Sequence, residues 1–151
     1  MDVISLLLGG IAMVQLIVGK KGKGKTKHLL DKVNSAVKTA SGNIVYLDKN
    51  SKNMYELNNK IRLINVSDYP LTDCDEFIGF ICGIISQDHD LEQMYLDSFL
   101  VNAHLEGQDV EPAIQKLEQI SGLFHVDFFI NISLDEHELP ESLKDKIIVS
   151  L

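Results

Sequence analysis

The chain has 151 residues, of which 45% are hydrophobic and 24% charged, a composition that fits one domain with a substantial core. Two cysteines exclude a disulfide scaffold, and 10 glycines and 3 prolines without a biased tract exclude collagen-like and disordered classes. The formal net charge of −8 argues against a general nucleic-acid binder, so we expect no nucleic-acid partner.

The segment 1–12 is apolar and precedes the first expected strand. The apolar run 3–18 is too short and too interrupted for an ordinary transmembrane helix, and Met1-Asp2 lacks the basic start of a secretory signal. We therefore expect a cytoplasmic protein without a transmembrane segment. It would consist of an N-terminal extension, 1–12, whose origin the sequence leaves open, and a single nucleotide-binding domain, 13–151.

Beyond this segment, apolar runs alternate with helical patterns, which predicts an α/β fold with a mainly parallel sheet between layers of helices. The expected strands are 13–18, 43–48, 61–66, 93–101, 125–132 and 146–150. The expected helices are 25–40, 51–60, 75–87 and 109–120, with a short turn or helix over 140–144. The run 93–101 fits either a strand or a helix, and we favour a strand.

The segment Gly19–Thr26, GKKGKGKT, matches the pattern G-x-x-x-x-G-K-[ST] in full and lies between an apolar strand and an amphipathic helix. Its glycines allow successive backbone amides to point inward and form an anion nest, to which the helix adds its positive dipole end. Lys25 is expected to neutralise the outer phosphates, and the Thr26 hydroxyl to bind Mg²⁺. The expected phosphate-binding residues are Gly19, Lys20, Lys21, Gly22, Lys23, Gly24, Lys25, Thr26 and Lys27.

In this motif and its flanking segments, over residues 13–40, the chain resembles the P-loop NTPases. In its length and its GKGKT loop it also resembles short bacterial P-loop proteins sometimes labelled twitching-motility ATPase-like, although the acidic and histidine boxes of pilus-retraction ATPases cannot be placed in it. The resemblance implies the three-layer P-loop fold. For a RecA-like member it implies that the last, first, fifth and fourth strands are neighbours in that order, with the second and third strands outward.

The resemblance also implies an acidic residue at the end of a neighbouring strand that holds Mg²⁺ through water. Asp97, which follows the run Met94–Leu96, resembles this Walker B aspartate. We assign Thr26 and Asp97 to the metal, and Lys25 and Asp97 to catalysis. Asp48 is the rival for the aspartate, but it ends the second strand, which the RecA-like arrangement is expected to keep remote from the phosphate loop.

Other residues bear on the reaction. Position 98 is serine where the family's usual catalytic glutamate would follow the Walker B aspartate, which argues against efficient hydrolysis. Arg62 is the only arginine, whereas kinases usually clamp phosphates with several. Asn59–Arg62 departs from the N-K-x-D pattern of guanine recognition, so ATP or ADP is the expected nucleotide. Asn131 or Ser133 fits either a polar sensor of the γ-phosphate or an ordinary strand end.

The charge distribution favours a polyphosphate ligand. Five lysines lie within residues 20–27, and outside them nine basic residues face 22 acidic ones, a balance of −13. We therefore expect a Mg·ATP-binding protein with slow or partner-stimulated ATPase activity. A non-hydrolysing, nucleotide-dependent interaction module is the alternative, and a small-molecule kinase fits less well. A protein partner and an oligomer are both compatible with the sequence.

Overall fold

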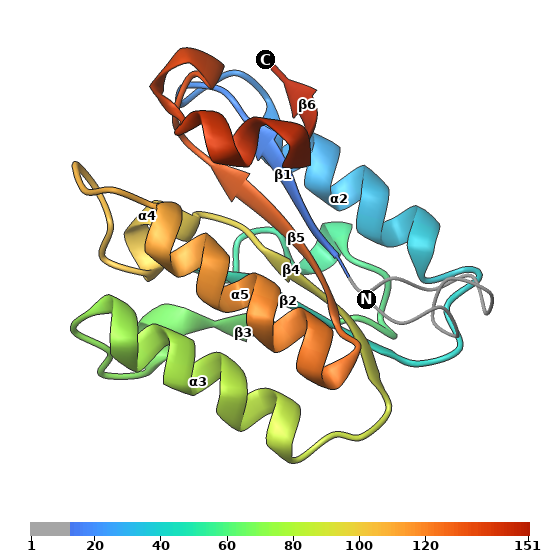
Figure 1. Ribbon diagram of the computed structural model, residues 1–151. Coiled ribbons are helices and arrows are strands. Elements are labelled where there is room, and N and C mark those ends of the chain that lie inside the picture. Colours follow the sequence, from blue (N-terminus) through green and yellow to red (C-terminus); the bar gives the residue numbers. More distant parts are fainter. Residues whose placement is uncertain (1–12) are drawn as a thin grey trace, which may run out of the picture.

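A six-stranded sheet runs through the centre of the chain, with every pair of neighbouring strands parallel and the order β3-β2-β4-β5-β1-β6 (Figure 1). The computed structural model describes residues 13–151, so the expected extension 1–12 lies outside the described residues. The strands are β1 (Val14–Val18), β2 (Asn43–Asp48), β3 (Arg62–Asn65), β4 (Leu91–Leu96), β5 (Asp127–Ile132) and β6 (Ile147–Ser150).

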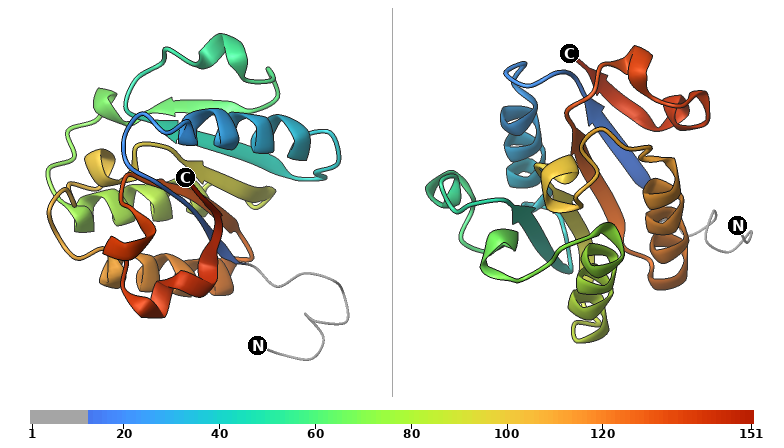
Figure 2. Two further views of the ribbon diagram at one scale, coloured as in Figure 1. Left: turned by 90° about the horizontal axis from the view of Figure 1, so that it is seen from above. Right: turned by 90° about the vertical axis from the view of Figure 1, so that its left-hand side faces the viewer.

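Helices cover both faces of this sheet, as Figure 2 shows. They are α2 (Lys25–Ala36), α3 (Cys74–Ser86), α4 (Phe99–Asn102) and α5 (Glu111–Phe124). Helix α2 packs on one face, and α3, α4 and α5 pack on the other. Strand β1 is apolar at four of its five positions because both of its faces are covered: Leu16 and Val18 pack into the α3–α5 layer, whereas Ile17 packs under α2.

The strand order is the one that the RecA-like resemblance implies, and the expected α/β class is confirmed. Because the strands are parallel, the carboxyl ends of β1, β2, β4 and β5 lie together at one end of the sheet, where ligands of open α/β sheets bind. The loop of the Gly19–Thr26 motif, which we call the phosphate loop after its expected role, leaves β1 at this end of the sheet. The fold therefore brings residues from segments far apart in the sequence to the same end of the sheet.

The expected strand 93–101 is wrong in its second half. Strand β4 ends at Leu96, and Phe99–Asn102 is helical. Between them Ser98 has a φ of 52°, and its amide donates to Asp97 Oδ1 over 2.9 Å. This local turn ends the strand within an apolar run, and it leaves the Asp97 side chain at the carboxyl end of β4.

Two expected helices are also corrected. The expected helix 51–60 contains only one 3₁₀ turn, Met54–Glu56, because side chains satisfy its flanking amides instead: Asn58 N donates to Asn34 Oδ1 over 2.9 Å. The helix expected over 25–40 ends as α-helix at Ala36 and continues as turns.

Candidate functional site

The loop between β1 and α2 is shaped by glycine. Gly22 and Gly24 have φ values of 82° and 93°, in the left-handed region that side chains disfavour. Gly24 is also the N-cap of α2, and no side chain caps the helix there. The first amides of α2 are therefore available to an anion at the positive end of the helix dipole.

Lys25, the first residue of α2, folds back over this loop. The residue is 8% exposed, and its Nζ donates to the carbonyl of Lys20 over 3.0 Å. Burial lowers the pKa of the Lys25 ammonium, and the nearby carboxylate of Asp97 opposes that shift. The cationic group is thus held at the mouth of the loop, within reach of an anion that the loop amides bind.

The next residue, Thr26, contacts the end of β4. Its hydroxyl donates to Asp97 Oδ1 over 3.3 Å. Asp97 Oδ1 also accepts from Asn131 Nδ2 over 3.0 Å. On the other oxygen, the hydroxyl of Tyr46 donates to Asp97 Oδ2 over 2.7 Å. Asp97, which is 4% exposed, therefore connects α2, β2 and β5 at the carboxyl ends of the strands.

Tyr46 belongs to a row of aromatic rings under α2. Its ring stacks on Tyr95 with 6.4 Å between centroids, and Tyr95 stacks on Phe129 at 4.6 Å. This packing fixes the direction of the Tyr46 side chain and aims its hydroxyl at Asp97. Burial raises the pKa of the Tyr46 phenol, and the charge of Asp97 raises it further, so the hydroxyl keeps its proton and remains a donor.

A second carboxylate, that of Asp48, lies at the same place. Asp48 is 3% exposed at the end of β2, and its Oδ1 accepts from the Ser98 hydroxyl over 3.2 Å. Burial raises the pKa of the Asp48 carboxyl, and the charge of Asp97 raises it further. The expectation that Asp48 is remote from the phosphate loop is wrong, because β2 is the direct neighbour of β4.

These residues line one cleft of about 370 Å³. Its lining includes Gly22, Gly24, Lys25 and Thr26 from the loop and the start of α2, and Asp48, Asp97 and Ser133 from the segments that follow the strands. Asn131 also lines it, and the Asn131 Oδ1 atom is buried without a hydrogen-bond partner among the described residues. An unpaired buried acceptor in a polar cleft indicates that the cleft holds water or a ligand donor.

The remaining residues of the motif lie apart from these: Gly19 is buried and its amide donates to the Leu134 carbonyl over 2.8 Å, whereas Lys20, Lys21 and Lys23 are exposed. Lys21 lines the cleft together with Lys49 and Lys52, two lysines that sequence reasoning missed. Lys27 instead pairs with Asp31 on the surface of α2, at 3.1 Å and with 81% of its side chain exposed. Lys49 and Lys52 belong to no motif, and only their position after β2 could have indicated that they line the cleft.

The donor set also fits a magnesium ion. Within residues 13–151 no three His, Cys, Asp or Glu side chains form a group able to hold a metal by themselves. Magnesium, however, usually keeps several waters and takes few protein ligands beside substrate phosphates. The Thr26 hydroxyl and the Asp97 carboxylate, adjacent to the phosphate loop, supply oxygen ligands of that kind.

Comparison with known proteins adds the fold-level context. The chain aligns with the crystal structure of flagellar accessory protein FlaH from Methanocaldococcus jannaschii, with a TM-score of 0.55 and 14% sequence identity, over 93% of this chain and 70% of that chain. The fold is RecA-like. No protein-family model and no curated protein matches the sequence. In the described part of the chain, no helix has the length and apolar character needed to cross a membrane.

Proposed function

We propose that this protein binds Mg·ATP in the cleft between the Gly19–Thr26 loop and Asp97 and hydrolyses it slowly. The observation that carries the proposal is the contact between Thr26 and Asp97, 3.3 Å apart, beside an uncapped helix start. A loop of free amides, one buried ammonium and a hydroxyl–carboxylate pair match the needs of a triphosphate and its metal.

Within the proposed complex, each group has a separate role. The amides of Gly22–Lys25 bind the phosphate oxygens, and Lys25 exchanges its bond to the Lys20 carbonyl for the outer phosphates. Thr26 would bind Mg²⁺ directly, and Asp97 would hold it through water. The ion would supply positive charge that offsets the charge developing on the phosphate oxygens.

Asp48 is the carboxylate that we assign to the attacking water. It lines the cleft, whereas position 98, where the family's usual glutamate stands, is a serine that donates to Asp48. In hydrolysis the water oxygen bonds to the γ-phosphorus, the bond from phosphorus to the bridging oxygen breaks, and Asp48 accepts the proton of the water. The raised pKa makes Asp48 a stronger base once it is deprotonated.

Nucleotide binding is tested by calorimetry with Mg·ATP. We expect binding by the wild type and its loss in Lys25→Ala. Lys116→Ala, which removes an exposed lysine of α5, is the matched control and retains binding. Equal binding by the wild type and Lys25→Ala would remove the proposal.

Hydrolysis is tested separately, by steady-state phosphate release at high protein concentration. We expect slow release that falls by about 10²-fold or more in Asp48→Asn, while ATP binding persists. Binding without any release by the wild type favours the alternative, a nucleotide-dependent interaction module. That alternative is motivated by the serine at position 98.

A further inference from the structure

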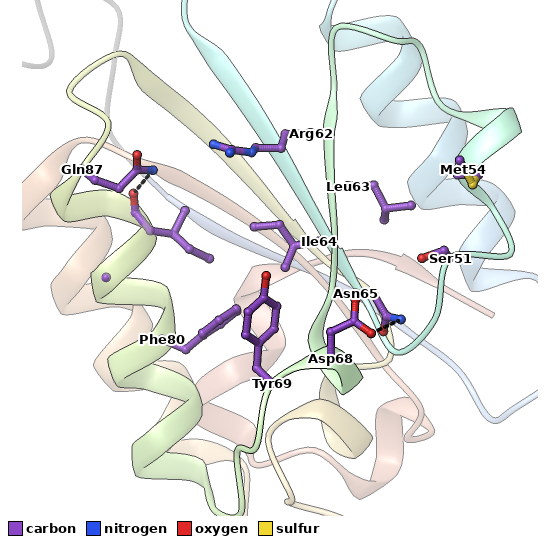
Figure 3. Close-up of a pocket in the computed structure, with 12 residues that line it drawn as sticks. Ser51, Met54, Arg62, Leu63, Ile64, Asn65, Asp68, Tyr69, Phe80 and Gln87 are labelled. Carbon is purple, nitrogen blue, oxygen red and sulfur yellow. Dashed lines mark hydrogen bonds between the residues drawn. The ribbon is translucent and has the colours of Figure 1, made fainter.

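A second hollow lies along the open edge of the sheet, on the far side of β2 from the phosphate loop (Figure 3). Its volume is about 630 Å³. All four residues of β3, Arg62–Asn65, line it, and so do side chains of α3. Because successive strand residues point to opposite faces, a hollow that touches all four follows the edge of the strand. We call it the edge groove.

The edge groove offers unused backbone bonding. Strand β3 pairs with β2 on one side only, and no described strand lies on its other side. Its outward amides and carbonyls are a template for one more strand. Such an open edge, unless it is protected, pairs with another chain.

The groove is also apolar where another chain would pack. Figure 3 shows Phe80 and Tyr69 meeting beside Ile64, and the two rings lie 5.0 Å apart between centroids. Tyr69 is 49% exposed, and Met54, at the other wall, is 49% exposed. Apolar side chains exposed beside an open strand edge indicate a surface that is covered in an assembly.

Opposite charges lie at the two ends of the groove. Arg62, at the start of β3, forms no ion pair with any residue of 13–151. Asp68 follows the end of β3 and accepts from Asn65 Nδ2 over 3.3 Å. In an antiparallel copy of the same edge, the arginine end of one groove meets the aspartate end of the other. The surface is therefore complementary to itself, which is the requirement for a two-fold interface.

We propose that the edge groove binds a second copy of this chain, with the two β3 strands antiparallel and the sheets joined into one. Each Arg62 then pairs with Asp68 of the other copy, twice by symmetry. Gly83, which lines the groove on α3, supports close approach, since nothing lies within 4 Å of a Cβ placed there. The groove and the phosphate cleft share no lining residue, although the segment 49–54 contributes neighbouring residues to both.

Sedimentation of the full chain over a range of concentrations tests the dimer. The wild type is expected to dimerise, and Arg62→Glu and Asp68→Arg each to weaken dimerisation by at least about tenfold through like-charge repulsion. Mixing these two variants restores dimers, and so does the double variant, because both arrangements place opposite charges together again. Lys116→Glu, the same charge change on α5, leaves the dimer unchanged.

A second variant tests the apolar wall by a different route. Gly83→Leu fills the groove at an exposed helical position, where leucine favours the helix more than glycine does. We expect an unchanged or raised melting temperature together with a weakened dimer. A wild type that remains monomeric up to about 1 mM overturns the proposal. So does a dimer that tolerates both charge reversals, or a monomer whose groove takes up an extended peptide instead.

Discussion

The hydroxyl of Thr26 lies 3.3 Å from the carboxylate of Asp97, across 71 residues of sequence. The first residue belongs to the opening turn of α2, and the second follows the end of β4. This contact depends on the sheet order, because β4 and β1 are separated by β5 alone. The sheet thus places an oxygen pair beside the phosphate loop.

The first prediction concerns this pair. Asp97→Asn and Thr26→Ala are expected to bind ATP in the absence of metal, but to lose the gain in affinity that Mg²⁺ provides, by at least about tenfold. Calorimetric titrations with ATP, with and without Mg²⁺, measure the difference. Asp145→Asn, at an exposed carboxylate that does not line the cleft, serves as the control. An undiminished effect of Mg²⁺ in both site variants would contradict the assignment.

The second prediction concerns the pH dependence of stability at Asp48. Its pKa is raised in the folded chain, so the folded state binds this proton more tightly than the unfolded state does. The associated stability is present at low pH and is lost as pH rises from about 4 through the raised pKa. At neutral pH, Asp48→Asn should therefore raise the melting temperature of the nucleotide-free protein. That gain should vanish near pH 4, and a variant less stable than the wild type at pH 7 would count against it.

The third prediction tests the support of Asp97 by Tyr46. Tyr46→Phe keeps the stacked ring but removes the buried 2.7 Å hydrogen bond to the carboxylate. The free energy of unfolding should fall by about 1.5–3 kcal/mol, as for other hydrogen bonds to charged groups. Denaturant unfolding measures it. Tyr55→Phe is the matched control, because that side chain is exposed and its loss of a hydroxyl should change stability little. If Tyr46→Phe lowered the free energy of unfolding by no more than Tyr55→Phe does, the hydrogen bond to Asp97 would contribute nothing to stability.

The fourth prediction separates two effects of a side chain in the loop, the strain of the backbone conformation and the steric room for a Cβ. A Cβ at Gly24 meets nothing within 4 Å, but its φ of 93° disfavours any side chain. Gly24→Ala should therefore cost about 1–2 kcal/mol and weaken nucleotide binding. Gly122→Ala, inside α5 with equal room, should stabilise by roughly 0.5–1 kcal/mol and leave binding unchanged. Thermal unfolding and calorimetry of both variants give the comparison, and similar behaviour of the two would contradict it.

Much of the fold could be predicted because local and global signals agree. The motif Gly19–Thr26 predicts a strand before it and a helix after it. Buried parallel strands such as Asn43–Asp48 are apolar runs with clear ends. The expected strand order then came from the resemblance that the motif carries. The fold class and this order are confirmed. The roles assigned to individual residues of the loop stay predictions.

The rest depended on contacts that a sequence pattern does not contain. The end of β4 lies inside an apolar run, and tertiary contacts decide it: Asn102 Nδ2 donates to the Asp97 carbonyl over 3.1 Å and holds the following turn. The expected position of Asp48 was wrong for a related reason. Its distance from the phosphate loop depends on how far the carboxyl end of β2 extends beside β4, and the Asp48–Ser98 contact joins residues 50 positions apart in the sequence.

The central claim is that the amides of the glycine loop bind a triphosphate. Amide resonances of isotopically labelled protein, followed while Mg·ATP is added, test it most directly. The account predicts large shifts at Gly22, Gly24 and Lys25, with smaller ones at Ser98. Unchanged loop resonances at saturating Mg·ATP, or shifts confined to residues outside the cleft, would contradict it.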